Sequence, residues 1–255
     1  MRHIDLFSGI GGFALAAQWT WGDEYANVGH SEVEPYPCKV YHRHFPESEC
    51  LGDITKIEWK EGQADIITGG FPCQPHSVAG KRKGSGDERD LWGECVRALR
   101  GIRPSYALFE NVPGLLTSER GRFFNRLLAD MAASGYDAEW QIVSAAGIGA
   151  THERARVWIA AYPNSERRER RGEVLHKEKL ANIKVEVSTS WDDLRNPFKN
   201  WEKLVPAPMV CGKDDGVPTY MVKRDLRALG NSIVPQVAQV IFEAIKQSEN
   251  ETTLP

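Results

Sequence analysis

Short apolar runs alternate with amphipathic stretches along the first half of the chain. The runs predict strands over residues 2–7, 26–31, 64–68, 106–109, 141–145 and 156–161. Between them, helices are expected over 13–19, from Pro35 onward, over 91–102 and over 123–133, the first turn at Pro35 suiting proline. In the third of these helices, apolar residues recur at the spacing of one helical face. Such alternation predicts an α/β fold with a largely parallel sheet.

The pattern changes after residue 163. Residues 164–218 combine charge clusters, prolines and aromatic residues without a sustained period, and Trp191, Phe198 and Trp201 are side chains that usually need burial. We interpret residues 163–222 as a small irregular module, with a partly disordered loop as the alternative. An apolar face then predicts a last helix over 235–246. The main domain is therefore expected to comprise residues 1–162 and 223–255.

Composition indicates a globular protein without a membrane partner. The chain has 255 residues, of which 41% are hydrophobic and 26% charged, enough for one domain or one domain with a small module. Its apolar runs are too short to span a bilayer, and the first residues do not form a signal peptide. The five cysteines are odd in number and lack a Cys-x-x-Cys pair, which argues against a disulfide framework and a zinc site. We expect a cytoplasmic monomer that binds no metal.

Charge is unevenly distributed. The whole chain carries −3, but residues 163–228 contain fourteen Lys or Arg against eleven Asp or Glu. A positive segment on an acidic body suits a local nucleic-acid contact, and a solvated insert explains it equally well.

Glycines and acids follow the predicted strands at positions that suit a nucleoside ligand. The loop from Ser8 to Gly12 follows the first strand, and its glycines allow backbone N–H groups to approach a ligand. Glu32 and Asp53 are interpreted as acids at the ends of the second and third strands. A carboxylate at such a position can bind ribose hydroxyls.

Cys73 differs in context from the other cysteines. It follows Gly69-Gly70-Phe71-Pro72, a run that cannot be regular helix, so the thiol is expected on a loop at the edge of the sheet. Nearby positive charge or a helix N-terminus would raise its thiolate fraction. An inert buried thiol is the ordinary alternative for a free cysteine.

A carboxyl and two arginines complete the candidate chemistry. Glu110 follows the strand over 106–109, where an acid is placed for proton donation or for a hydrogen bond to a base. Arg154 and Arg156 alternate, so they are expected to point the same way from a strand and to form a paired anion or base contact. Exposed arginines on an edge strand are the alternative.

Together these motifs resemble the cytosine-5 DNA methyltransferase family. The resemblance covers residues 4–162 and resumes over 229–245. The motifs that carry it are Asp5-Leu6-Phe7-Ser8-Gly9-Ile10-Gly11-Gly12, Gly69-Gly70-Phe71-Pro72-Cys73-Gln74, Glu110-Asn111-Val112, His152-Glu153-Arg154-Ala155-Arg156 and Gly230-Asn231-Ser232-Ile233-Val234-Pro235.

The resemblance implies a Rossmann-like catalytic domain that binds S-adenosyl-L-methionine and methylates double-stranded DNA, with residues 163–222 as the target-recognition module. The implied cofactor residues are Asp5, Phe7, Ser8, Gly9, Ile10, Gly11, Glu32, Val33, Asp53, Ile54, Pro72, Asn231 and Ser232. Cys73 resembles the nucleophile that adds to carbon 6 of a flipped cytosine, and Glu110 the acid at ring nitrogen 3. Arg154 and Arg156 resemble the pair that steadies the base and the catalytic loop.

Neighbouring residues modify this expectation. The Gly- and Lys-rich run over 79–86 predicts a mobile loop that closes over DNA phosphates. His76 and His152 replace the usual phenylalanine and glutamine, and either histidine could alter loop packing or add a titrating group. The short recognition module implies selectivity for only a few base pairs.

Three other functions compete with this interpretation. A relative of the same fold could methylate cytosine in transfer RNA. A catalytically silent DNA-binding protein is disfavoured by the presence of Cys73, Glu110 and the arginine pair. A nicotinamide-dependent enzyme is disfavoured because the first loop lacks the glycine spacing of dinucleotide-binding proteins.

Overall fold

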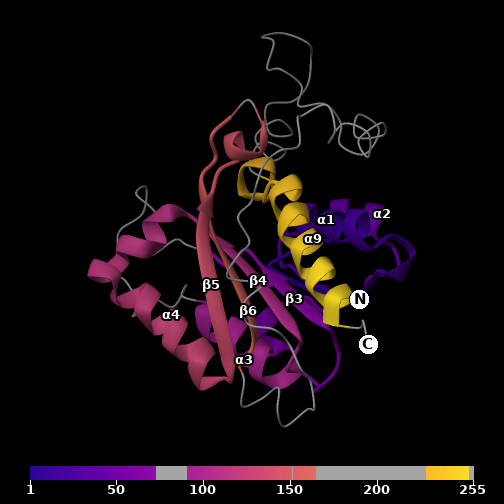
Figure 1. The fold of residues 1–255 in the computed structure, drawn as a ribbon. Coiled ribbons are helices and arrows are strands. Elements are labelled where there is room, and N and C mark those ends of the chain that lie inside the picture. Colours follow the sequence, from indigo (N-terminus) through magenta and orange to yellow (C-terminus); the bar gives the residue numbers. More distant parts are fainter. Residues whose placement is uncertain (73–90, 151, 165–227, 253–255) are drawn as a thin grey trace.

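The protein is built around one six-stranded sheet with the order β2-β1-β3-β4-β6-β5. We describe a computed structural model over residues 1–72, 91–150, 152–164 and 228–252 (Figure 1). The strands are β1 (Arg2–Leu6), β2 (Ala26–Ser31), β3 (Ile66–Gly69), β4 (Tyr106–Asn111), β5 (Tyr136–Val143) and β6 (Arg156–Pro163). Strand β1 pairs in parallel with β2 and β3, and β3 with β4, whereas β6 pairs antiparallel with β4 and β5. The predicted α/β fold with a largely parallel sheet is confirmed.

Helices cover both faces of this sheet. They are α1 (Gly12–Trp21), α2 (Pro35–His44), α3 (Trp92–Ile102), α4 (Arg122–Ala133) and α9 (Pro235–Thr252). Short 3-10 helices, which the sequence did not predict, lie at η1 (Gly22–Glu24), η2 (Ile54–Lys56), η4 (Pro113–Gly121) and η5 (Ala146–Ile148).

Alternation along the buried strands produces a separate core on each face. Ile67 and Phe109 pack with α3 and α4, whereas their neighbours Ile66 and Leu108 pack with α1 and α9. Successive strand residues point to opposite faces, so a strand that is covered on both sides is mostly apolar rather than alternating. The result is a three-layer arrangement in which the sheet lies between two pairs of helices (Figure 1).

Helix α9 returns from the far end of the sequence and packs on α1. Phe242 is fully buried, and its ring lies 5.1 Å from that of Trp21. Lys246 Nζ donates to the carbonyl oxygen of Thr20 at 2.9 Å. The contacts join the last described helix to the first one. Most of residues 163–222, predicted as a separate module, lie outside the described ranges.

The first described helices after β1 and β3 lie on opposite faces of the sheet. Strand β1 leads into α1 on one face, and α3, the first described element after β3, lies on the other face. Because β1 and β3 are neighbours, the loops after Leu6 and Gly69 begin side by side. Such a switch point outside the carboxyl ends of the strands is the usual ligand crevice of an open α/β sheet.

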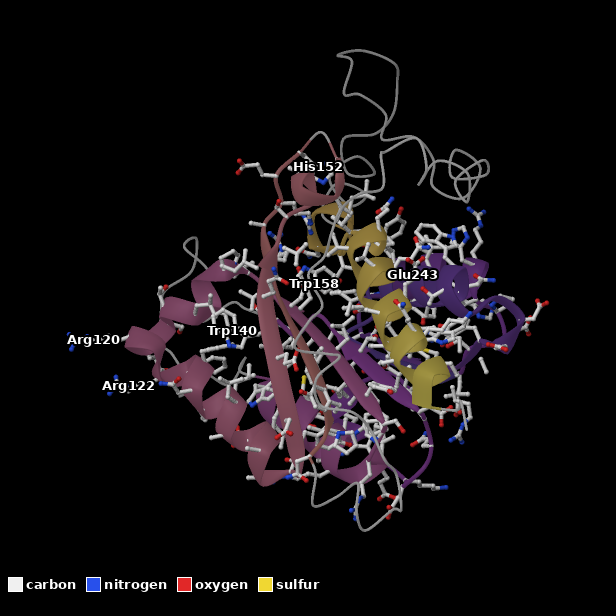
Figure 2. All side chains as sticks on the ribbon, in the orientation of Figure 1. Arg120, Arg122, Trp140, His152, Trp158 and Glu243 are labelled. Atoms are coloured by element: carbon white, nitrogen blue, oxygen red, sulfur yellow. The ribbon has the colours of Figure 1, made fainter. Side chains whose placement is uncertain are left out.

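The bounds of one predicted strand were wrong. The sequence placed it over 141–145, but β5 runs from Tyr136 to Val143 and pairs along its whole length with β6. Strand β5 is at the edge of the sheet, and even its apolar residues Trp140 and Ile142 are about half exposed. Because an edge strand can be partly polar, the first half of β5 lacked the apolar pattern from which strands were predicted. Figure 2 shows Trp140 beside α4, where the centroid of its ring lies 5.1 Å from that of Phe124.

A search for membrane spans within the described part of the chain found no helix with both the length and the apolar character required.

The packing of α9 leads to a stability prediction. Phe242→Ala should lower the free energy of unfolding by about 3–5 kcal/mol, because it removes a fully buried ring from the contact with α1. Glu243→Ala, at the exposed neighbouring position, should change it by no more than about 0.5 kcal/mol. Urea unfolding measures both, and equal losses in the two variants would contradict the packing described.

Candidate active site

The loop after β1 is held in a compact conformation at the carboxyl edge of the sheet. Phe7, Gly9 and Gly11 all have positive φ angles of 53°, 53° and 92°. Such angles suit glycine, whereas at Phe7 they are unusual and mark a strained turn. The amide of Ser8 donates to the Ser31 carbonyl at 3.0 Å, which ties the loop to the end of β2. The tight turn and this tie fix where the amides of the loop point.

Glu32 fixes the same loop through its carboxylate. Oε2 accepts from the amide of Gly9 at 3.0 Å, and Oε1 accepts from the amides of Val33 and Glu34 at 2.8 Å each. A carboxylate has about four acceptor directions, so one remains for a ligand hydroxyl. Val33 beside it is 66% exposed, which leaves an apolar side chain at the edge of the loop. Ile10 on the loop is half-buried.

Two buried polar groups belong to this region. Asp5 is fully buried, its Oδ1 accepts from Thr68 Oγ1 at 2.9 Å, and its carboxyl also accepts a backbone hydrogen bond from Ala14. The hydroxyl of Ser8 has no partner among the described residues. Burial raises the pKa of Asp5 well above its usual range. Buried groups of this kind usually meet water or a ligand.

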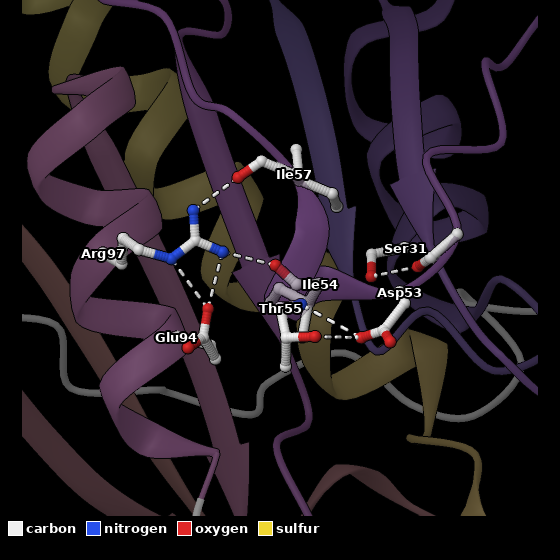
Figure 3. Close-up of polar contacts among 8 residues, drawn as sticks. Ser31, Asp53, Ile54, Thr55, Ile57, Glu94 and Arg97 are labelled. Atoms are coloured by element: carbon white, nitrogen blue, oxygen red, sulfur yellow. Dashed lines mark hydrogen bonds and ion pairs between the residues drawn. The ribbon is translucent and has the colours of Figure 1, made fainter.

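Asp53 occupies a different position from the one predicted. It does not end the third strand, which is Ile66–Gly69, but precedes the 3-10 helix η2. Its Oδ1 accepts from the amide and the hydroxyl of Thr55 at 3.1 and 2.8 Å. The preceding segment forms a parallel bridge with β2 between His30 and Cys50, so Asp53 still emerges at the carboxyl edge (Figure 3).

Glu110 lies within β4, which extends to Asn111 and so runs beyond the predicted end of this strand. Only 9% of Glu110 is exposed, and Arg156 Nε contacts its Oε1 at 2.9 Å. Burial raises the pKa of Glu110 to about 7, although the charges of Arg156 and Arg154 act in the opposite direction. Near neutral pH this carboxyl can therefore both hold and release a proton, as a general acid must.

Asn111 connects the acid to the segment that leads to Cys73. Its Nδ2 donates to the carbonyl oxygen of Phe71 at 3.1 Å, and its Oδ1 accepts from the amide of Val112 at 2.9 Å. A Cβ on Gly70 would lie 3.5 Å from Glu110 Oε2, so the described chain up to Pro72 passes close to the carboxyl. Cys73, His76 and the run over 79–86 lie outside the described residues.

The two arginines serve different contacts. Strand β6 begins at Arg156, and Arg154 precedes it with a φ of 36°, so the prediction that both project from one strand was wrong. Arg154 Nη2 donates to the carbonyl of Gly230 at 2.8 Å and also to that of Ser232. His152, just before it, is exposed at the top of Figure 2.

Through these bonds Arg154 holds the segment that precedes α9 next to the first loop. A Cβ on Gly12 would lie 2.6 Å from Ile233 Cγ1 and 3.3 Å from Ser232 Oγ, so only glycine allows this approach. Ser232 thus lies at the loop after β1, and the exposed Asn231 precedes it. The structure brings together Glu32 with the first loop, Glu110 with Arg156, and Arg154 with Ser232.

Sequence reasoning assigned no individual role to three supporting residues. Asn111, Thr68 and Arg97 act through hydrogen bonds to partners distant in the sequence. Only Asn111 had a local signal, as a polar residue that directly follows Glu110.

Comparison with known proteins identifies the family. Residues 1–205 match the family described as C-5 cytosine-specific DNA methylase. The chain therefore belongs to this family.

The curated relatives agree. The chain is 37% identical over 163 residues to Type II methyltransferase M1.ScrFI of Lactococcus lactis subsp. cremoris, which covers 63% of this chain and 41% of that protein. It is 36% identical over 163 residues to the orphan methyltransferase M.Rho11sI of Bacillus phage rho11s, covering 62% of this chain and 32% of that one. The chain spans about two fifths of the length of the curated relatives it matches.

Solved structures share the fold. The S. pombe Dnmt2 methyltransferase aligns over 100% of both chains with a TM-score of 0.57 at 17% identity. The Entamoeba histolytica methyltransferase EhMeth covers 64% of this chain and 52% of that one, with a TM-score of 0.52 at 21% identity.

The raised pKa of Glu110 predicts a pH-dependent stability. Between its ordinary pKa of 4.5 and the folded value of about 7, the folded state holds a proton that the unfolded state has lost. Stability contributed by protonated Glu110 is thus fully present below about pH 4.5 and is lost as pH rises through about 7. As pH rises through this range, the free energy of unfolding of the wild type should fall, relative to that of Glu110→Gln, by about 3 kcal/mol at most.

Urea unfolding of both proteins at pH 5 and pH 8 measures this difference. A stability difference between them that is the same at both values would show that burial does not raise this pKa.

Proposed function

We propose that this chain catalyses transfer of a methyl group from S-adenosyl-L-methionine to carbon 5 of cytosine in double-stranded DNA. The observation that carries the proposal is the buried carboxyl of Glu110, whose pKa of about 7 suits a proton donor and whose position is fixed by Arg156. The tether from Asn111 to Phe71 brings the chain that leads to Cys73 beside this carboxyl.

The described residues fit the cofactor. The strained loop from Phe7 to Gly11 presents backbone amides, and the hydroxyl of Ser8 in this loop has no partner among the described residues. The remaining acceptor direction of Glu32 suits a ribose hydroxyl, and exposed Val33 an aromatic base. When bound, S-adenosylmethionine supplies an electrophilic methyl group.

We therefore assign one cofactor site to residues from five segments. It comprises Asp5, Phe7, Ser8, Gly9, Ile10, Gly11, Glu32, Val33, Asp53, Ile54, Pro72, Asn231 and Ser232. The bonds from Arg154 to Gly230 and Ser232 support the inclusion of the last two residues, because they fix the chain end against the first loop.

The proposed chemistry assigns one role to each catalytic residue. The Cys73 thiolate adds to carbon 6 of the cytosine, while Glu110 donates its proton to ring nitrogen 3, so that carbon 5 becomes nucleophilic. After methylation a base removes the proton from carbon 5, and the thiolate leaves from carbon 6. Arg156 orients Glu110, and Arg154 supports the segment beside it.

DNA must enter this site as an extruded base. Glu110 lies at the carboxyl edge of a sheet that is covered on both faces, so a base inside a stacked duplex could not reach it. Residues 163–222 would recognise the duplex, since they form most of the segment 163–228, whose net charge is positive. Residues 1–162 and 223–255 would form the catalytic domain, a monomer that acts in the cytoplasm as part of a DNA modification system.

A covalent adduct tests the nucleophile. The protein should form a denaturation-resistant complex with 5-fluorocytosine-containing genomic DNA in the presence of the cofactor, because fluorine at carbon 5 prevents release of the thiol. Cys73→Ala should abolish the complex, and Cys50→Ser, at an exposed cysteine, should retain it.

Labelled cofactor with genomic DNA and with transfer RNA then identifies the substrate. Glu110→Gln should lower DNA methylation by about a hundredfold or more, in the range of a lost general acid. Label in transfer RNA alone would assign the site to RNA, and label in neither would refute the proposed activity.

A further inference from the structure

Arg97 in α3 forms hydrogen bonds to the turn that carries Asp53 and Ile54. Its Nη1 donates to the carbonyl of Ile57 and its Nη2 to the carbonyl of Ile54, so one guanidinium spans both ends of η2 (Figure 3). Glu94, one turn earlier in α3, accepts from Arg97 Nε at 2.8 Å and fixes the plane of the guanidinium. A planar fork with several donors is suited to such a two-point contact.

The turn also carries Asp53, which we assign to the proposed cofactor site. Ile54 is buried in the core that α3 shares, whereas the side chain of Asp53 is 37% exposed. Ser31 Oγ, at the end of β2, donates to the carbonyl of Gly52 at 2.8 Å and holds the entrance of the turn. The turn is thus fixed by β2 on one side and by Arg97 on the other.

We propose that Arg97 is a positioning residue that sets the place of Asp53 and Ile54 and thereby the affinity for the nucleoside part of S-adenosylmethionine. The inference rests on the proposed function. Displacement of the turn would move both residues together, since Thr55 binds Asp53 within the same turn. Because Arg97 binds only protein groups among the described residues, its loss should affect cofactor binding and leave the chemical step unchanged.

Arg97→Met removes both hydrogen bonds to the turn, and Arg97→Lys keeps the positive charge without the planar guanidinium. We expect the dissociation constant for S-adenosylhomocysteine, measured by calorimetry without DNA, to rise about tenfold in Arg97→Met and about threefold in Arg97→Lys. The KM for S-adenosylmethionine should rise by similar factors, with kcat within about twofold. Arg100→Met is the matched control, because Arg100 lies in the same helix and, among the described residues, its side chain donates only to Ser134 Oγ, at 2.9 Å.

A double-mutant cycle separates positioning from general stability. If Arg97 acts through the turn, Arg97→Met should add little to the binding loss of Asp53→Ala, whereas independent effects would multiply. Unchanged affinity in both Arg97 variants, or a multiplied loss in the double variant, overturns the proposal. Failure of the wild type to bind S-adenosylhomocysteine would instead overturn the proposed function itself.

Discussion

The site depends on a single buried ion pair between Glu110 in β4 and Arg156 at the start of β6. A carboxyl moved out of water favours its neutral form, and a nearby guanidinium opposes that shift, so the two effects determine its charge together. Here burial outweighs the arginine charges, and the pKa of Glu110 rises to about 7. An acid with this value can donate a proton at neutral pH and stay bound to its partner.

The geometry around the pair follows from the topology. Strands β4 and β6 are antiparallel, so the end of β4 lies beside the beginning of β6. The segment before β6 supplies Arg154, which fixes the chain end, and the segment after β3 runs past the carboxyl under the tether of Asn111. Three stretches distant in sequence therefore meet where the proposed cytosine would lie.

Much of the fold could be predicted from local pattern, because the buried strands and the amphipathic helices each have a clear period. Strand β2 was predicted with its observed bounds, and Glu110 with the correct edge of the sheet. Strand β5 was misplaced because an edge strand has mixed exposure. Asp53 and Arg154 were placed on strands that their neighbours do not form, since both stand in turns defined by side-chain to backbone bonds.

The contacts that sequence could not predict are those between distant segments. Arg97 forms hydrogen bonds to Ile57 and Ile54, which lie 40 and 43 positions before it in the sequence. No local pattern indicates these contacts. The same is true of Gly12, whose missing side chain makes room for Ile233. Resemblance to the family predicted the reactive residues, whereas the structure showed which contacts hold Glu110, Arg154 and Arg156.

The central claim is that burial, opposed by Arg156, sets the charge of Glu110. Carbon-13 NMR titration of the Glu110 carboxyl tests this most directly, in the wild type and in Arg156→Met. The account predicts a pKa of about 7 in the wild type and a higher pKa in the variant, where the opposing charge is gone. A pKa near 4.5 in the wild type, or no rise in the variant, would contradict it.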